Sequence, residues 1–129
     1  MRFRVTGIER GKCEVWANTH DGGRYEPLAF VLRDDAGDGK AWHWSAKHNE
    51  PPFFMPFYTY GFKTRRGCIN HCIRTALLRQ AERAIEQVMA RPELNEILRS
   101  PTRHALHDMR RSRLFSFVEM HEMRERMGL

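Results

Sequence analysis

The chain has 129 residues, 41% of them hydrophobic, which suits one domain with its own core and excludes a globally disordered protein. It has no run of about 20 apolar residues that would span a membrane, and its first residues lack an apolar signal core, so we expect no secretion. Three cysteines, an odd number, favour a reducing compartment over a disulfide framework, and we therefore expect a cytoplasmic protein.

The first half of the chain has the pattern of short strands joined by tight turns. Within residues 13–18, for example, Cys13, Val15 and Ala17 share one face. Glycine- and aspartate-containing turns separate the apolar runs, and a meander of neighbouring antiparallel strands is the economical topology. The predicted strands are residues 2–8, 13–18, 28–33, 40–46 and, as a fifth, 57–62.

Aromatic residues concentrate around a proline-rich connector at residues 48–56. Eight of the fourteen lie between Trp42 and Phe62. Most are expected to pack between the sheet and the helices. The alternative is an exposed platform for bases or for the side chains of a partner protein. Phe53 and Phe54, which follow a pair of prolines, are the best candidates for exposed contacts.

A long amphipathic helix is predicted to follow the strands. Apolar residues recur at helical spacing from Ile69 to Val88. The hydroxyl of Thr64 can cap a helix that starts at Arg65, and Pro92 predicts its end. The capping box is incomplete, because a glycine stands where glutamate or glutamine is expected.

The last part of the chain is predicted to contain a short helix at residues 93–99 and then a break. Ser100 and Pro101 have the pattern of an N-cap and a first helical residue. A final helix or helix pair follows over residues 102–127, and it either completes the core or binds another copy or another protein. Its apolar stripe is Leu106, Met109, Leu114, Phe117, Val118 and Met120.

These patterns predict one α+β domain, with a β-rich half at residues 1–62 and a basic helical half at residues 63–129. An antiparallel β-meander of four to five strands packs on the long helix, and a C-terminal helical segment follows.

The segment of about residues 28–80, where strands lead into the start of the long helix, resembles known small modules. Trp42-x-Trp44, then a Tyr-Gly-Phe-Lys-Thr run ending at Thr64, resemble small sheet-then-helix modules. These include the arm-type DNA-binding domain of phage integrases and the YegP-like family of bacterial units. The proline-rich segment and the helical tail depart from both. In the integrase type the sheet enters the major groove, which implies a DNA-reading sheet face here with Lys40, His43, Ser45 and Lys47.

Cysteine and histidine are closely spaced at Cys68, His71 and Cys72. A zinc site needs four ligands, usually as two pairs, and a second pair is missing; His104 and His107 lack the glutamate of a zincin motif. Cys68 near a helix N-terminus, with His71 three residues later, has the spacing of a nucleophile and its base. Cys72 falls on the apolar stripe, where cysteine packs as a small hydrophobic residue. We expect no stoichiometric zinc, no cofactor and no catalytic residue.

The net charge of +6 is unevenly distributed. Residues 1–50 hold eight basic and eight acidic residues, whereas residues 51–129 hold fourteen basic and eight acidic residues. Arginine outnumbers lysine eighteen to four, and its planar guanidinium suits paired hydrogen bonds to phosphate. The asymmetry indicates a positive face toward an acidic partner, most often nucleic acid. The alternative is an arginine-rich composition without a specific partner.

Two functions fit a basic chain without a catalytic signature. The first is a non-catalytic nucleic-acid-binding accessory protein, for DNA or RNA, whose helical half contacts phosphates. The second is a protein-interaction module, such as a phage or mobile-element product that acts as an adaptor or inhibitor of a host complex through its aromatic loop and terminal helix. Residues predicted to bind nucleic acid are Arg65, Arg66, Arg74, Arg110, Arg111 and Arg113; those predicted to bind a protein partner are Phe53, Phe54, Phe117 and Met120.

Overall fold

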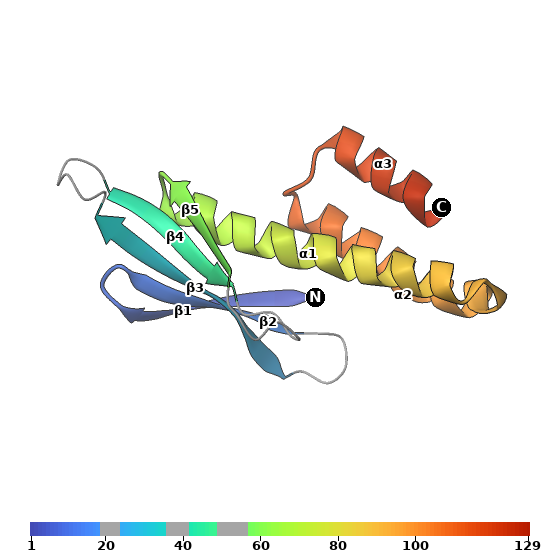
Figure 1. Ribbon diagram of the computed structural model, residues 1–129, viewed down its shortest axis with the longest axis horizontal. Coiled ribbons are helices and arrows are strands. Elements are labelled where there is room, and N and C mark those ends of the chain that lie inside the picture. Colours follow the sequence, from blue (N-terminus) through green and yellow to red (C-terminus); the bar gives the residue numbers. More distant parts are fainter. Residues whose placement is uncertain (19–23, 36–41, 49–56) are drawn as a thin grey trace. The chain divides into compact units, whose positions relative to one another are not determined.

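The computed structural model describes residues 1–18, 24–35, 42–48 and 57–129 (Figure 1). The chain forms two compact units, Met1–Ile73 and Arg74–Leu129. Strands give way to helices after residue 62, as the sequence predicted, but the boundary between the two units falls inside the long helix α1 (Arg65–Ala90). The reason is that Cys68 and Cys72, in the first turns of α1, belong to the core of the sheet.

The first unit contains an antiparallel sheet whose strands lie in the order of the chain, which confirms the predicted meander and the α+β class (Figure 1). The register shifts between Val15 and Trp16, where Pro27 is the partner. Proline has no N–H to donate to the ladder, which fits an irregularity at this point. The strands are β1 (Arg2–Glu9), β2 (Lys12–Asn18), β3 (Tyr25–Asp35), β4 (Trp42–His48) and β5 (Phe57–Phe62).

One face of this sheet is covered by the first turns of α1. Along β2, buried Cys13, Val15 and Ala17 alternate with half-buried residues, as expected for a strand with one covered face. The predicted inward face of β2 is therefore confirmed. The core consists of Cys13, Val15, Ala29, Val31, Ala46, Cys68 and Cys72, with Leu28, Trp44, Phe62, Ile69 and Ile73 packed against it.

The start of α1 is fixed by the predicted cap. The N–H of Gly67 donates to Thr64 Oγ1 at 3.0 Å, which satisfies one of the unpaired amides of the first turn. A Cβ at position 67 would lie 3.1 Å from that oxygen, so glycine leaves room for a close cap. The helix therefore begins with one half of a capping box, the hydrogen bond to the Thr64 hydroxyl.

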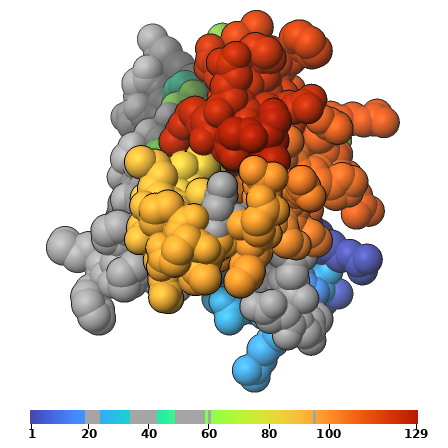
Figure 2. Space-filling view, turned by 90° about the vertical axis from the view of Figure 1, so that its right-hand side faces the viewer, coloured from blue at the N-terminus to red at the C-terminus, as the bar shows by residue number. Residues whose placement is uncertain are grey.

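The second unit is a helical bundle. It contains α1 from Arg74 onward, a 3-10 turn η1 (Pro92–Leu94), α2 (Asn95–Ser112) and α3 (Phe117–Met127). Figure 2 shows α3 in red beside the ends of α1 in yellow and α2 in orange. Of the two alternatives for residues 102–127, the helix pair is the one that forms. Buried apolar residues from all three helices make its core: Ala76, Leu77, Ala81, Ala84, Ile85, Ala105, Leu106, Met109 and Met123.

The predicted helix break at Ser100 and Pro101 is wrong, because α2 continues through Pro101. Proline in a helix interior removes one backbone hydrogen bond and disfavours the preceding turn. The next residue, Thr102, is buried and donates its hydroxyl to the carbonyl of Arg99 at 2.7 Å. Burial of Thr102 and of the apolar stripe that follows it outweighs the local preference of proline for a helix start.

The apolar stripe predicted for the terminal segment is right for α2 and partly wrong for α3. Leu106 and Met109 are buried, whereas Phe117 is 87% exposed and Val118 is 62% exposed. Met123 is the buried residue of α3. The chain breaks between the two helices at residues 113–116, so the helical phase of α2 does not continue into α3.

A complete capping box starts α3, and the sequence pattern Ser-x-x-Glu signals it. The hydroxyl of Ser116 accepts from the N–H of Glu119 at 3.1 Å, and the Glu119 carboxylate accepts from the N–H of Ser116 at 3.0 Å. Gly128, with a φ of 70°, ends the helix in the left-handed conformation that glycine adopts without strain. Both ends of α3 are therefore locally encoded.

Candidate nucleic-acid interface

Arg74, one of the predicted phosphate contacts, is engaged inside the helical unit. Its guanidinium forms a two-pronged ion pair with Glu119 and donates to the carbonyl of Leu114 at 2.9 Å. The same group lies over the ring of Phe115, 4.6 Å from its centre. The Arg74 hydrogen bond, followed by the Ser116 N–H, lowers the pKa of Glu119 to about 2. Arg74 is therefore a neutralised tether for the segment between α2 and α3.

A second two-pronged pair joins α3 to α1. Arg126 donates to the two carboxylate oxygens of Glu82 at 2.7 and 2.6 Å, and this contact lowers the pKa of Glu82. In this pair and in the Arg74 pair, a carboxylate of the unit is bound to an arginine that holds the helices of the bundle together. The remaining arginines of α2 and α3 are thereby left with fewer acidic partners.

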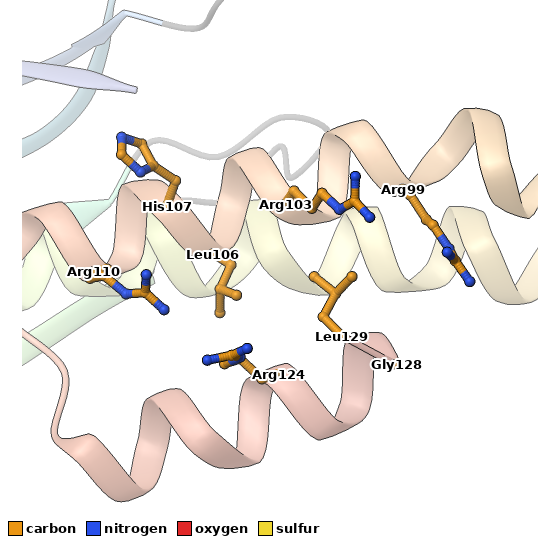
Figure 3. Close-up of a pocket in the computed structure, with 8 residues that line it drawn as sticks. All are labelled: Arg99, Arg103, Leu106, His107, Arg110, Arg124, Gly128 and Leu129. Atoms are coloured by element: carbon orange, nitrogen blue, oxygen red, sulfur yellow. The ribbon is translucent and has the colours of Figure 1, made fainter.

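A cleft of about 480 Å³ lies between α2 and α3 (Figure 3). The side chains of Leu106 and Leu129 point into the space between the helices, and Arg124 extends toward it from α3. No carboxylate side chain lines it. We call it the arginine cleft; its lining residues are Arg99, Arg103, Leu106, His107, Arg110, Arg124, Gly128 and Leu129.

Helical spacing brings the cations of α2 to the arginine cleft. Arg99, Arg103 and Arg110 are separated by four and seven residues, which places them along one side of a helix. Arg99 lies 3.5 Å from the carboxylate of Glu96. Within the part of the chain that the structure describes, no ion pair joins Arg103, Arg110 or Arg124 to a carboxylate. The arginine cleft therefore combines three unneutralised guanidinium groups with a short apolar floor.

Only one of the six predicted nucleic-acid-binding residues, Arg110, lines the arginine cleft. Arg111 and Arg113 are exposed elsewhere on the second unit, and Arg65 and Arg66 are exposed in the first turn of α1, in the other unit. Sequence analysis missed Arg99, Arg103 and Arg124, although the regular spacing along residues 99–110 was a visible signal. Of the predicted partner contacts, Phe117 is exposed, Met120 is half-buried, and Phe53 and Phe54 lie outside the described residues.

The sheet residues implied by the integrase resemblance share one face. Cross-strand pairing puts Ser45 opposite Leu32 and Lys47 opposite Phe30, on the face away from α1, and His43 follows the same alternation. Ser45 is only 4% exposed and is poorly placed to reach a base edge. Lys40 lies outside the described residues.

The three cysteines lie together in the core of the first unit. Cys13, Cys68 and Cys72 are all buried, and none of them forms a disulfide. The hydrogen bond from Cys68, then burial, raises the pKa of the Cys72 thiol far above its usual range. The ring of His71, the residue with the spacing of a base for Cys68, packs against the ring of Phe62, with the two ring centroids 5.0 Å apart. Among the described residues, no group of three His, Cys, Asp or Glu side chains is arranged to hold a metal ion.

Burial predicts that the thiols are unreactive in the folded protein. Treatment with an aromatic disulfide reagent should modify none of the three cysteines rapidly under native conditions, and all three after denaturation, because the thiolate is the reactive form. Absorbance of the released thiolate measures this. Rapid native modification that disappears in Cys68→Ser would instead support the nucleophile interpretation.

No helix in the described ranges has both the length and the apolar character needed to cross a membrane. The chain matches no known protein family, no curated protein and no solved structure. The resemblance to integrase arm-type and YegP-like modules therefore depends only on the residues named for it.

Proposed function

We propose that this protein is a non-catalytic nucleic-acid-binding protein that holds backbone phosphates in the arginine cleft. The observation that carries the proposal is the set of three guanidinium groups, on Arg103, Arg110 and Arg124, gathered at one cleft without a carboxylate partner in the described structure. Like charges held close together favour an anionic ligand that neutralises them. Guanidinium also presents the fork of donors that fits phosphate oxygens.

The dimensions of the arginine cleft favour a chain of phosphates over a single ion. Arg99 and Arg110 are eleven residues apart on one helix, which corresponds to about 16 Å along its axis. Successive phosphates of one nucleic-acid strand rise by roughly 3.4 Å along the duplex, so this row spans several of them. A polyanion can therefore contact both ends of the row at once.

The salt dependence of binding tests the proposal. The double variant Arg103→Gln/Arg110→Gln should weaken nucleic-acid binding and reduce the slope of log affinity against log salt by about two, roughly one per lost phosphate contact. Fluorescence anisotropy of a labelled oligonucleotide across a salt series measures both quantities.

The matched control is Arg111→Gln/Arg113→Gln, which removes the same amount of charge at the C-terminal end of α2 but outside the arginine cleft. This variant should bind with nearly the wild-type slope. Equal losses in the two double variants would mean that only net charge matters, and unchanged binding in both would contradict the proposal.

Protein docking is the second candidate function, and the exposure of Phe117 and Val118 favours it. Two adjacent apolar side chains left in solvent at the start of α3 are typical of an interaction surface. If α3 binds a second copy, Phe117→Ser should convert a dimer to a monomer in light scattering, with little dependence on salt. A wild-type chain that is monomeric at high concentration would contradict self-association.

The proposal includes a cytoplasmic location, which three buried cysteines without a disulfide support. The integrase-like residues favour DNA as the nucleic acid.

A further inference from the structure

The sheet of the first unit has a second face that no described element of that unit covers. Cross-strand partners identify its members: Arg4 lies opposite Trp16 and Trp16 opposite Pro27, and Glu14 lies opposite Phe30. These residues are exposed or half-buried, in contrast to the buried residues that alternate with them. We call this surface the open sheet face.

Three aromatic side chains, Trp16, Tyr25 and Phe30, lie on the open sheet face, on the neighbouring strands β2 and β3. Side chains at diagonal positions of adjacent strands are close enough for aromatic groups to form one surface. The indole N–H of Trp16 donates to Thr6 Oγ1 at 2.9 Å, so the ring is held across β1. A ring fixed in advance loses little conformational entropy when a ligand stacks on it.

Cations accompany these rings. The guanidinium of Arg4 lies over the ring of Tyr25, 4.2 Å from its centre, and the ammonium of Lys12 lies 5.8 Å from the centre of the Phe30 ring. Guanidinium planes are themselves stacking surfaces for bases. Lys47, opposite Phe30, adds a further positive charge on the same side.

The charge of this face complements a nucleic acid. Among residues whose side chains are described, cross-strand pairing places Arg2, Arg4, Lys12 and Lys47 on it, against two carboxylates, Glu9 and Glu14. The combination of positive charge with flat aromatic surface is what single-strand-binding proteins use: cations follow the backbone and rings stack on bases.

We propose that the open sheet face is a stacking platform for the unpaired bases of a single-stranded nucleic acid. The inference rests on the proposed function for the class of partner and adds the form that the partner takes. A duplex hides the flat faces of its bases, so it cannot use Trp16 or Phe30 as stacking partners. Ser45, which the integrase resemblance assigns to base reading in the major groove, is buried on this face.

Comparison of single-stranded and duplex oligonucleotides of one length tests the platform. We expect the wild-type protein to bind a labelled oligothymidylate more tightly than the matched duplex at the same salt concentration. Trp16→Leu should weaken single-strand binding by about ten-fold, because one base loses its stacking partner. Its salt slope should stay at the wild-type value, since no charge is removed. Trp16→Phe, which keeps a ring, should retain most of the affinity.

Phe30→Leu, on the adjacent strand, is an independent second variant. It tests the platform if Trp16→Leu does not fold. Folding of each variant is checked by circular dichroism. A folded Trp16→Leu or Phe30→Leu protein with wild-type single-strand affinity, or a wild-type preference for the duplex, would overturn the platform. Either result leaves the proposed function intact if the cleft variant still changes the salt slope. Absence of binding to every oligonucleotide at low salt would overturn both.

Discussion

Replacement of Met109 by alanine is expected to destabilise the helical unit by about 2–5 kcal/mol. Met109 is fully buried and is among the largest side chains in the core of that unit. Its loss removes apolar contacts and leaves a cavity that the surrounding helices fill only in part. Chemical denaturation followed by circular dichroism measures the change, because α1, α2 and α3 supply the helical signal.

Met89→Ala is the matched control, since it makes the same chemical change at a helical position that is 76% exposed. Its effect should stay within about 0.5 kcal/mol. The three tryptophans lie in the first unit, so their fluorescence reports the sheet while circular dichroism reports mainly the helices. Equal destabilisation by the two substitutions would show that Met109 is not part of a packed core.

Features with a local cause could be predicted from the sequence. The alternation of Cys13, Val15 and Ala17 identifies the inward face of β2, and the hydroxyl of Thr64 marks the start of α1. Both signals depend on residues a few positions apart, and the structure confirms both. The capping box of Ser116 and Glu119 is equally local and could have been predicted in the same way.

Features that depend on distant residues could not be predicted. Pro101 has a strong local preference for a helix start, yet burial of Thr102 and of the stripe after it carries α2 through that position. Likewise, counting charges identified the helical half as basic but did not identify which arginines have partners. Glu119 is forty-five residues from Arg74 in the chain, and no sequence spacing predicts that the two residues pair.

Because of this pairing, substitution of Arg74 tests whether an arginine in the basic half of the sequence necessarily contributes to nucleic-acid binding. Arg74→Met keeps the aliphatic stem and removes the guanidinium that joins Glu119 and the Leu114 carbonyl. We expect a melting temperature several degrees lower than that of the wild type. A partly exposed ion pair contributes modestly, but the half-buried Leu114 carbonyl also loses its hydrogen-bond donor. The salt slope of nucleic-acid binding should not change, because the charge was already neutralised.

Acid titration gives the Arg74 substitution a second signature. The pKa of Glu119 is lowered from 4.5 to about 2, so between these pH values the unfolded chain binds more protons than the folded protein. The contribution of the pair is therefore fully present above about pH 4.5 and is lost as the pH falls through about 2. Stability curves of wild type and Arg74→Met, measured by denaturation at each pH, should converge across this window. Arg83→Met, at an exposed position of α1, should run parallel to the wild type. If Arg74→Met instead keeps wild-type stability and reduces the salt slope by about one, then Arg74 contacts phosphate, as its position in the basic half of the sequence predicted.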